Sequence, residues 1–410
     1  MTRLTSIEEA RHKVLAEASP LETELISLSE ALGRVLAQEI VAPHPLPPFD
    51  NAGMDGYAVR AADLVDATPE SPIALEIIDV IPAGRVSTRS VGPGQAAKIM
   101  TGAPIPGGAD AVVQVEATEE TEGRVLVREA VRPGRNIRRA GEDVAAGESV
   151  LAAGAVLGPP EIGLLAALGR SVVRVHRKPR VAILSTGSEL VEVDRPLGPG
   201  QLHNSNAYSL QALCRQLGLE PVVLGIVPDD YQATRELVAR GLEHDVLLTS
   251  GGVSVGQFDF VKEVQDELGV ERRLWGVAVK PGKPLSFGVR GRTLVFGLPG
   301  NPVSVMVSFE LFVRPALLRL MGYRQTIRPT YRAIVAEDVA NSDSRVFVVR
   351  VRAWREDDRW HVSSTGAQGS GILRSMVGAN GLIFIPPGPG GVRAGDEVEF
   401  LLLREDLVEP

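Results

Sequence analysis

The alternation of apolar strands and amphipathic helices between Arg180 and Gly322 constrains the fold of this chain most strongly. Short apolar runs recur there, and each is followed by a stretch with apolar residues at helical spacing. We expect strands at 181–185, 222–227, 246–250 and 293–297, and helices at 206–217, 232–242, 260–268 and 302–321. Repeats of this kind predict a central, doubly wound parallel α/β domain, which we place at residues 177–327.

The regions on either side of this domain predict mainly β structure. Residues 44–147 contain short β-like runs separated by Gly, Pro and acidic turns, at 73–80, 95–100, 111–116 and 124–131. Residues 328–410 have strand patterns at 331–335, 345–354, 360–364, 381–385 and 397–403. We therefore expect a small inserted β domain at 44–147 and a C-terminal, β-barrel-like domain at 328–410.

The remaining segments predict an elongated N-terminal α/β region made of residues 1–43 and 148–176. Thr5 and Glu8 have the spacing of a capping box ahead of an amphipathic helix. The expected elements are helices at 6–18, 29–37 and 161–168 and a strand at 23–28. The chain is thus expected to be multidomain, with the small β domain inserted into this region.

Composition excludes several classes of protein. A net charge of −8 and an aromatic content of 4% argue against nucleic acid as a partner. No apolar run approaches the roughly 18 residues of a membrane span, and the polar start of the chain argues against export. The single cysteine, Cys214, lies in a helical pattern and is expected to be a buried structural thiol. We expect a cytoplasmic protein without a membrane partner.

The strand-to-helix loops of the α/β domain hold most of the candidate chemistry, because ligands bind beyond the carboxyl ends of parallel strands. Ser and Gly residues at these loops expose N–H groups that suit phosphate. The candidate substrate-binding residues are Ser185, Thr186, Gly187, Ser250, Gly251, Gly252, Ser254, Gly256, Pro299, Gly300, Asn301, Pro302 and Ser304. The chain has 37 arginines but only six lysines, and two of those, Lys280 and Lys283, share one short motif.

Carboxylates in the same loops suit a divalent cation. Glu189, Asp259 and either Asp229 or Asp230 offer the hard oxygen ligands that Mg²⁺ takes beside phosphate. Less specific interpretations exist for each motif. Residues 251–256 have P-loop-like glycine spacing but lack the Lys-Ser/Thr pair, and Asn301-Pro302 can be a simple helix cap. The histidines show no metal-ligand spacing, which argues against a zinc site. No Ser-His-Asp set appears, which argues against a hydrolase.

Two stretches of the inserted β domain also carry charged groups. The turn at 47–58 places Asp50 and Asp55 between two aromatic residues, and by itself it is most simply a loop with solvated acids. Arginines cluster at 132–139 and form a positive patch that can clamp an oxyanion, although a solvated face is the commoner outcome.

In these motifs the chain resembles the molybdopterin molybdenumtransferase family, which includes MoeA and the gephyrin E domain. The matching stretches are PPFDNxxMDGYA at 47–58, MTGAPIP at 100–106, NIRRAGED at 136–143, STGxEL at 185–190, TSGGVSVG at 249–256, KPGKP at 280–284 and GLPGNPVS at 297–304. The resemblance implies a molybdopterin-binding α/β domain within a homodimer. It also implies insertion of molybdate into adenylylated molybdopterin with release of AMP, supported by Mg²⁺.

The resemblance assigns residues by motif. Active-site positions are implied for Asp55, Thr101, Arg138, Asp143, Glu189, Asp259, Lys280 and Lys283. Glu189, Asp229 and Asp259 are implied near Mg²⁺, and Asp50 is expected to be structural. The Asp55 turn of one subunit is expected to close over the site of the other. Departures are modest: Ala52-Gly53 stands for the usual Ser-Ala, and Ser188 for Asp or Asn.

Two rival functions remain at this stage. A molybdopterin-binding carrier or scaffold of the same fold would not need Asp55, Glu189 and Asp259 together. A molybdopterin-adenylylating enzyme would have the α/β domain alone. Such an adenylyltransferase, and molybdenum apo-enzymes, are instead expected as protein partners.

Overall fold

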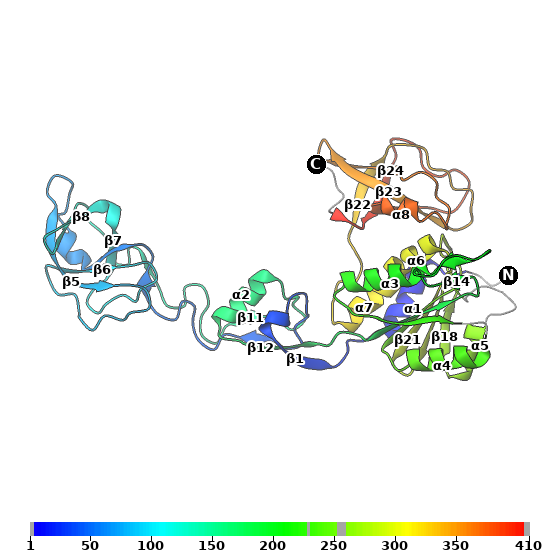
Figure 1. The fold of residues 1–410 in the computed structure, drawn as a ribbon. Coiled ribbons are helices and arrows are strands. Elements are labelled where there is room, and N and C mark those ends of the chain that lie inside the picture. The colour runs from blue at the N-terminus through cyan, green and yellow to red at the C-terminus, as the bar shows by residue number, and fades with distance from the viewer. Residues whose placement is uncertain (1–3, 228–229, 252–259, 406–410) are drawn as a thin grey trace. The chain divides into compact units, whose positions relative to one another are not determined.

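The structure is a computed structural model that describes residues 4–227, 230–251 and 260–405. The chain forms two compact units (Figure 1). The large unit comprises Met1–Leu25, Gly33–Ala37 and Arg174–Pro410, and the small unit comprises Ile26–Leu32 and Gln38–Val173. No helix in the described part of the chain has the length and apolarity that a membrane span needs.

The large unit contains the predicted α/β domain around a six-stranded sheet with the order β16-β13-β17-β21-β20-β18. Four of its strands are parallel: β13 (Val181–Thr186), β16 (Val222–Val227), β17 (Val246–Ser250) and β21 (Thr293–Leu298). The other two, β20 (Ser286–Arg290) and β18 (Glu271–Trp275), extend the sheet with antiparallel pairings that the sequence pattern does not predict.

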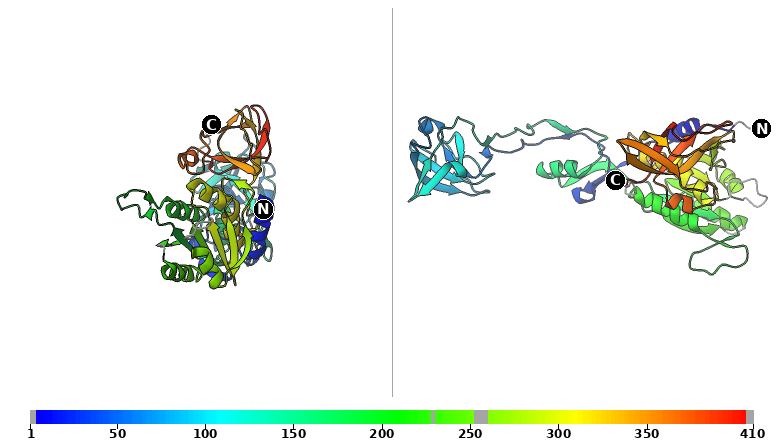
Figure 2. Two further views of the ribbon diagram at one scale, coloured as in Figure 1. Left: turned by 90° about the vertical axis from the view of Figure 1, so that its right-hand side faces the viewer. Right: turned by 90° about the horizontal axis from the view of Figure 1, so that it is seen from above.

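Helices cover both faces of this sheet, as expected for a doubly wound domain (Figure 2). Alternate residues of β13 show this, because Ile183 faces one apolar core and Ala182 and Leu184 face the other. The first face carries α1 (Ile7–Glu17), α3 (Ser205–Gln216), α6 (Pro302–Ser308) and α7 (Arg314–Leu320). The second carries α4 (Tyr231–Gly241) and α5 (Phe260–Glu267). Cys214 lies buried in the first core, and burial raises the pKa of its thiol to about 12.

Local structure differs from the sequence prediction at two helices. The helix expected at 302–321 contains a π-helical segment, η4 (Phe309–Val313), between α6 and α7. Pro315 follows η4 and has no N–H to continue a regular i→i−4 ladder, which favours such a widened turn. The helix expected at 29–37 is wrong: only a 3₁₀ turn, η1 (Leu28–Glu30), forms, and Gly33 adopts φ +72°.

The first helix packs in a different place from the one expected. Its N-cap is Ser6, whose Oγ accepts a hydrogen bond from Glu9 N at 3.1 Å, instead of Thr5. Ile7, Ala10 and Val14 of α1 then pack into the α/β core of the large unit. The sequence places this helix with residues 148–176 only as an expectation, because spacing alone does not say which core an apolar stripe meets.

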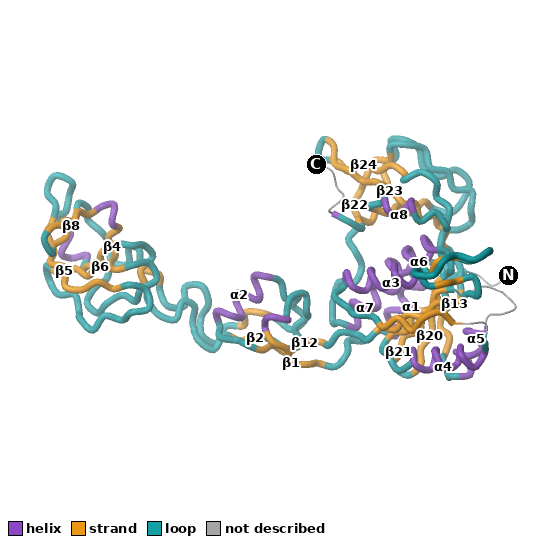
Figure 3. The backbone as a smooth tube through the Cα atoms, viewed as in Figure 1, coloured by secondary structure: helices purple, strands orange, loops and turns teal. Residues whose placement is uncertain are grey.

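The C-terminal part of the large unit is a closed five-stranded barrel, as predicted (Figure 3). Its strands are β22 (Thr330–Val335), β23 (Val346–Glu356), β24 (Arg359–Ser364), β25 (Gly381–Ile385) and β26 (Glu397–Leu402). Pairing of β23 with both β24 and β25 closes it. A short helix, α8 (Arg374–Val377), covers one side, and β19 (Val279–Lys280) adds a parallel pairing onto β23.

The small unit is built on a six-stranded sheet with the order β7-β4-β6-β5-β9-β8. The strands are β4 (Gly56–Val59), β5 (Ile73–Ile81), β6 (Gln95–Ile99), β7 (Ala111–Gln114), β8 (Thr118–Thr121) and β9 (Arg124–Val127). Apolar cores lie on both faces, so Tyr57 and Ala58 point into different ones. The β runs predicted for the inserted domain are confirmed.

Short elements complete the description of the chain. They are β1 (Thr23–Ser27), β2 (Ile40–Val41), β3 (Asn51–Ala52), η2 (Ala61–Leu64), η3 (Val115–Ala117), β10 (Ile137–Arg138), β11 (Ser149–Leu151), α2 (Pro159–Ala167), β12 (Val172–His176), β14 (Leu190–Val191) and β15 (Leu202–His203). Helix α2 begins at the Pro159-Pro160 pair, close to the start predicted for it.

Candidate functional site

In the small unit, the Asp55 carboxylate is held in one orientation. Its Oδ1 accepts two hydrogen bonds, from Thr101 N and from Thr101 Oγ1, each at 2.7 Å. These bonds lower the pKa of Asp55, so the group is ionised at neutral pH. The residue is exposed, and its Oδ2 bonds to no described residue. A fixed, charged carboxylate is therefore presented to solvent.

The neighbouring glycine explains why the turn has this shape. Gly56 begins β4 in the middle of the sheet, and a Cβ there would lie only 1.9 Å from the carbonyl oxygen of Val113. Only glycine allows β4 to approach β7 this closely. Asp55 is thereby fixed at the start of a buried strand, and its carbonyl accepts a hydrogen bond from Val115 N at 3.1 Å.

Arg138 and Thr101 lie on the two sides of the segment that precedes Asp55. Strand β10 pairs with β3, which places Arg138 opposite Asn51. On the other side, Gly102 N donates to Ala52 O at 2.8 Å. Arg138 and Asp143 are exposed, and neither side chain forms a hydrogen bond or ion pair with a described residue. Both are free to contact a ligand.

Asp50 is used within the fold, which agrees with the structural role expected for it. Its carboxylate accepts hydrogen bonds from Ala140 N at 2.8 Å and from Arg139 Nη1 at 2.6 Å. These contacts lower the pKa of Asp50. One arginine of the cluster at 132–139 is thus structural, whereas Arg138 is not.

In the large unit, the register of the sheet brings the candidate loops together. Ser185 of β13 pairs with Ser250 of β17, which in turn pairs with Leu298 of β21. A Cβ on Gly251 would lie 2.3 Å from Thr186 O, and Gly251 N donates to Leu298 O at 3.1 Å. The three loops after these strands are therefore in direct contact.

Several predicted substrate-binding side chains are buried beneath these loops. Ser185, Ser250 and Ser304 are each at most 3% exposed. Ser185 Oγ donates to Asn204 Oδ1 at 2.9 Å, and Ser250 Oγ accepts from Asn206 Nδ2 at 2.9 Å. These hydroxyls hold the loops together, and a ligand would meet backbone groups above them.

Asn301 does not act as the expected side-chain cap of α6. Its Nδ2 donates to Ser370 Oγ of the barrel at 2.9 Å, and Val303 N donates to Ser370 O at 3.1 Å. Ser370 thus occupies the Val303 N–H at the start of α6, which is then not available to a phosphate.

The two lysines of the 280–284 motif have different surroundings. Lys280 Nζ lies 4.9 Å from the centre of the Phe347 ring and 4.0 Å from Asp343 Oδ2. Asp343 is itself bound by Arg345, whose hydrogen bonds lower its pKa to about 2. Lys283 is exposed and has no ion pair among the described residues. Lys283 is therefore the freer cation.

The predicted magnesium ligands are only partly described. Glu189 is exposed, and its carboxylate folds over Gly187, where a Cβ would meet it at 2.6 Å. Asp230 caps α4, since its Oδ1 accepts a hydrogen bond from Ala233 N at 2.8 Å. Because Asp230 has this capping role, Asp229 is the better candidate for the magnesium ligand. Asp229, Gly252, Ser254, Gly256 and Asp259 lie outside the described residues.

Sequence reasoning missed Arg350, which is completely buried in β23. Its guanidinium donates to Ser375 Oγ at 3.2 Å, Gly369 O at 3.2 Å and Val348 O at 3.4 Å. No carboxylate among the described residues pairs with it, and burial lowers its pKa to about 10. The arginine within the otherwise apolar run at 346–351 was the available signal.

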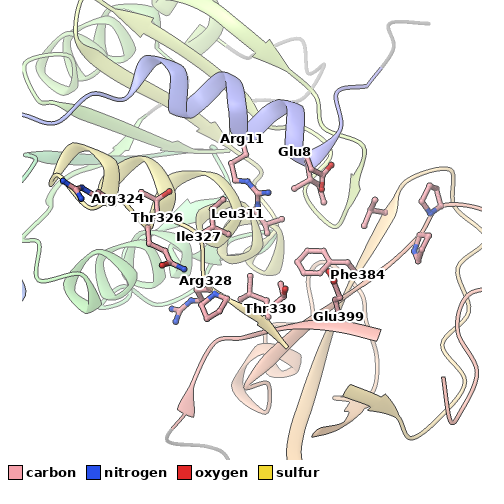
Figure 4. Close-up of a pocket in the computed structure, with 17 residues that line it drawn as sticks. Glu8, Arg11, Leu311, Arg324, Thr326, Ile327, Arg328, Thr330, Phe384 and Glu399 are labelled. Carbon is pink, nitrogen blue, oxygen red and sulfur yellow. The ribbon is translucent and has the colours of Figure 1, made fainter. Parts of the chain in front are cut away.

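A cavity of about 800 Å³ lies away from these residues, between α1, the linker 324–330 and the barrel (Figure 4). Arg11, Arg328 and Glu399 line its rim, and Leu311 and Phe384 its apolar wall. None of the predicted catalytic or substrate-binding residues lines it.

Comparison with known proteins supports the whole architecture. The chain matches family models described as MoeA N-terminal region (domain I and II) at residues 5–169, probable molybdopterin binding domain at 182–319 and MoeA C-terminal region (domain IV) at 332–403. It is similar to a molybdopterin molybdenumtransferase of Haemophilus influenzae, with 38% identity over 96% of this chain and 98% of the relative. A Staphylococcus epidermidis protein of that name is 36% identical over 98% and 97%.

A solved structure shows the same fold. The molybdopterin biosynthesis MoeA protein of Pyrococcus horikoshii OT3 matches with a TM-score of 0.81 and 35% identity, covering 98% of this chain and all of that one. The fold and these matches define an enzyme of molybdenum cofactor biosynthesis. The chain belongs to the molybdopterin molybdenumtransferase family, which confirms the resemblance seen in its motifs.

Proposed function

We propose that this chain inserts molybdate into adenylylated molybdopterin and releases AMP, as a Mg²⁺-dependent, cytoplasmic homodimer. The observation that carries the proposal is the Asp55 carboxylate, which is ionised, exposed and fixed by Thr101 with one oxygen free. Such a group can orient water or a metal ion at the phosphoanhydride that must break. A carrier protein would have no need to hold a carboxylate in this way.

The residues of the large unit supply the binding half of the proposal. The contacting loops after β13, β17 and β21 offer backbone N–H groups, and Lys283 offers a free cation for phosphate or molybdate. Arg138 offers a second cation from the small unit. In the proposed dimer, these groups from two subunits suit a substrate with two phosphate groups and a second reactant that is an oxyanion.

A magnesium ion fits what is described of its proposed ligands. Glu189 is an exposed carboxylate that bonds to no described residue, and hard oxygen donors suit Mg²⁺. The described residues contain no group of three or more His, Cys, Asp or Glu side chains arranged to hold a metal. The proposed set adds Asp229 and Asp259, which lie outside the described residues, on the basis of the sequence motifs alone. When bound, the ion would neutralise phosphate charge beside Glu189.

A direct assay separates this enzyme from a carrier. Purified protein is given adenylylated molybdopterin, molybdate and Mg²⁺, and both AMP release and reconstitution of a molybdenum apo-enzyme are followed. The proposal requires AMP release that depends on molybdate and falls sharply in Asp55→Asn. Binding of the substrate without AMP release would favour the carrier function. The adenylyltransferase and apo-enzymes are proposed as the proteins that deliver substrate and accept product.

Subunit mixing tests the proposal that Asp55 of one subunit completes the site of the other. Asp55→Asn and Lys283→Met are purified separately and then allowed to exchange subunits. If each site takes Asp55 and Lys283 from different chains, a mixed dimer regains one intact site, and total activity rises to about a quarter of wild type. Activity that stays at the level of the single variants would show that both residues act within one chain.

A further inference from the structure

The start of α3 lies across the carboxyl edge of the sheet, in the middle of the candidate loops. Asn204 caps the helix, with its Oδ1 accepting hydrogen bonds from Ser185 Oγ at 2.9 Å and Ala207 N at 3.4 Å. Asn206 follows in the first turn. Both asparagines are at least nine-tenths buried.

The side-chain amide of Asn206 joins two loops that are far apart in the sequence. Its Nδ2 donates to Ser250 Oγ at 2.9 Å and to Gly300 O at 2.7 Å. Both N–H groups of the amide are thereby used. The reverse orientation of the amide would set Oδ1 against the Gly300 carbonyl, so the observed one is the only one that bonds Gly300.

The hydrogen bond from Asn206 to Gly300 O also fixes the direction of the N–H group that follows this carbonyl, that of Asn301. A carbonyl and the following N–H belong to one planar trans peptide and point in opposite directions. With Gly300 O directed inward to Asn206, the Asn301 N–H is directed away from the core. Neither Gly300 N nor Asn301 N donates to any described group, and both residues are exposed. An outward, unpaired donor is therefore held in a fixed direction.

Two further buried atoms show that this arrangement costs folding free energy. Asn206 Oδ1 and Asn204 Nδ2 are buried and have no hydrogen-bond partner among the described residues. Buried amide atoms are rarely left in this state. Apolar residues at these positions would avoid the cost but would release Gly300.

We propose that Asn206 is a positioning residue that aims the Asn301 N–H at a phosphate group of the nucleotide substrate. This inference rests on the proposed function, since it names the element that orients one donor of that site. The phosphate is that of an adenylate, either within the anhydride of the substrate or in the released AMP, and recognition is by charge and hydrogen bonding rather than by the base.

Binding of AMP and of adenosine to Asn206→Ser tests the inference, because the two ligands differ only in the phosphate. Serine is neutral and too short to reach both loops. We expect the affinity for AMP to fall about tenfold, as one well-aimed donor to a charged group is lost, while adenosine binds as to wild type. Asn380→Ser is the matched control, because Asn380 is an equally buried amide that bonds Ala353 within the barrel. It should lower the melting temperature without changing the preference for AMP.

The outcomes separate the inference from the proposed function. If wild type prefers AMP to adenosine and Asn206→Ser keeps that preference, the inference is overturned and the proposed function stands. A wild type that binds AMP no better than adenosine overturns both. Should Asn206→Ser fail to fold, Asn206→Thr provides a second neutral variant for the same comparison.

Discussion

Thr101 donates both its backbone N–H and its hydroxyl to the same oxygen of Asp55, at 2.7 Å in each case. The two residues come from different segments of the small unit, 46 positions apart. Two donors on one oxygen leave the other oxygen of the carboxylate free and fix its direction. The pair is therefore one fixed unit, and we propose that Thr101 orients the carboxylate with which Asp55 acts.

Asp55→Asn should remove activity and leave the fold intact. The neutral amide has no negative charge with which to attract a cation and cannot take a proton, so we expect the rate of AMP release to fall by about 10²–10⁴-fold. The side chain is exposed, and the melting temperature should stay within the error of wild type. Equal rates for Asp55→Asn and wild type would contradict the assignment.

Thr101→Val should shift the pH dependence of the reaction. Loss of the hydroxyl removes one of the two bonds that lower the pKa of Asp55, so this pKa rises toward its ordinary value. The carboxylate then becomes protonated at a higher pH, and the acid limb of kcat/KM moves to higher pH. Thr101→Ser keeps the hydroxyl and should keep the wild-type limb. An unchanged limb in Thr101→Val would argue against Asp55 as the ionised group.

Much of the fold was predictable because its signals are local. Residues 246–248 are apolar, and β17, the strand that they begin, is buried at every position. Strands β18 and β20 were missed because charged Arg272 and Arg273 and the glycine Gly288 interrupt their patterns. Local spacing also predicted a helix at 29–37, but Gly33 adopts φ +72° and is incompatible with a continuous helix over these residues.

The candidate site was predictable in its motifs but not in its contacts. Turn and glycine patterns marked Asp55 and the loops at 185–190 and 297–304. The link from Asn206 to Gly300 spans 94 residues, and an asparagine near a helix start is read as a cap. The bond between Asn301 and Ser370 is also non-local, so Asn301 occupies the expected N-cap position of α6 but its side chain bonds the barrel instead of the helix.

Gly56→Ala should destabilise the protein through backbone overlap. The added Cβ would lie 1.9 Å from Val113 O in the middle of the sheet, and strand β4 would have to move. We expect a loss on the order of 3 kcal/mol in the free energy of unfolding of the small unit, measured by urea denaturation. Gly163→Ala is the control, because nothing lies within 4 Å of its Cβ position in helix α2. That change should stabilise by about 0.5–1 kcal/mol.

Stability at acid pH should depend on Asp343. Hydrogen bonds from Arg345 lower the pKa of Asp343 from 3.8 to about 2 in the folded protein. A depressed folded pKa contributes stability above the unfolded value, and that contribution is lost as pH falls from about 4 to about 2. Asp343→Asn should therefore lower stability at pH 6 and flatten its dependence between pH 4 and pH 2. Asp357→Asn, in an exposed turn, should leave the profile unchanged, and identical profiles for both variants would contradict the prediction.

Arg350→Met should separate stability from activity. Methionine removes three hydrogen bonds but also removes a buried charge that no described carboxylate neutralises. These effects oppose each other, so we expect the free energy of unfolding to change by less than about 2 kcal/mol. Activity should fall at least about tenfold, because Arg350 fixes the carbonyl of Gly369, and the next residue, Ser370, binds Asn301. Arg352→Met, an exposed change on the same strand, is the control for loss of positive charge. Full activity in Arg350→Met would mean that the barrel loop does not position the Asn301 loop for catalysis.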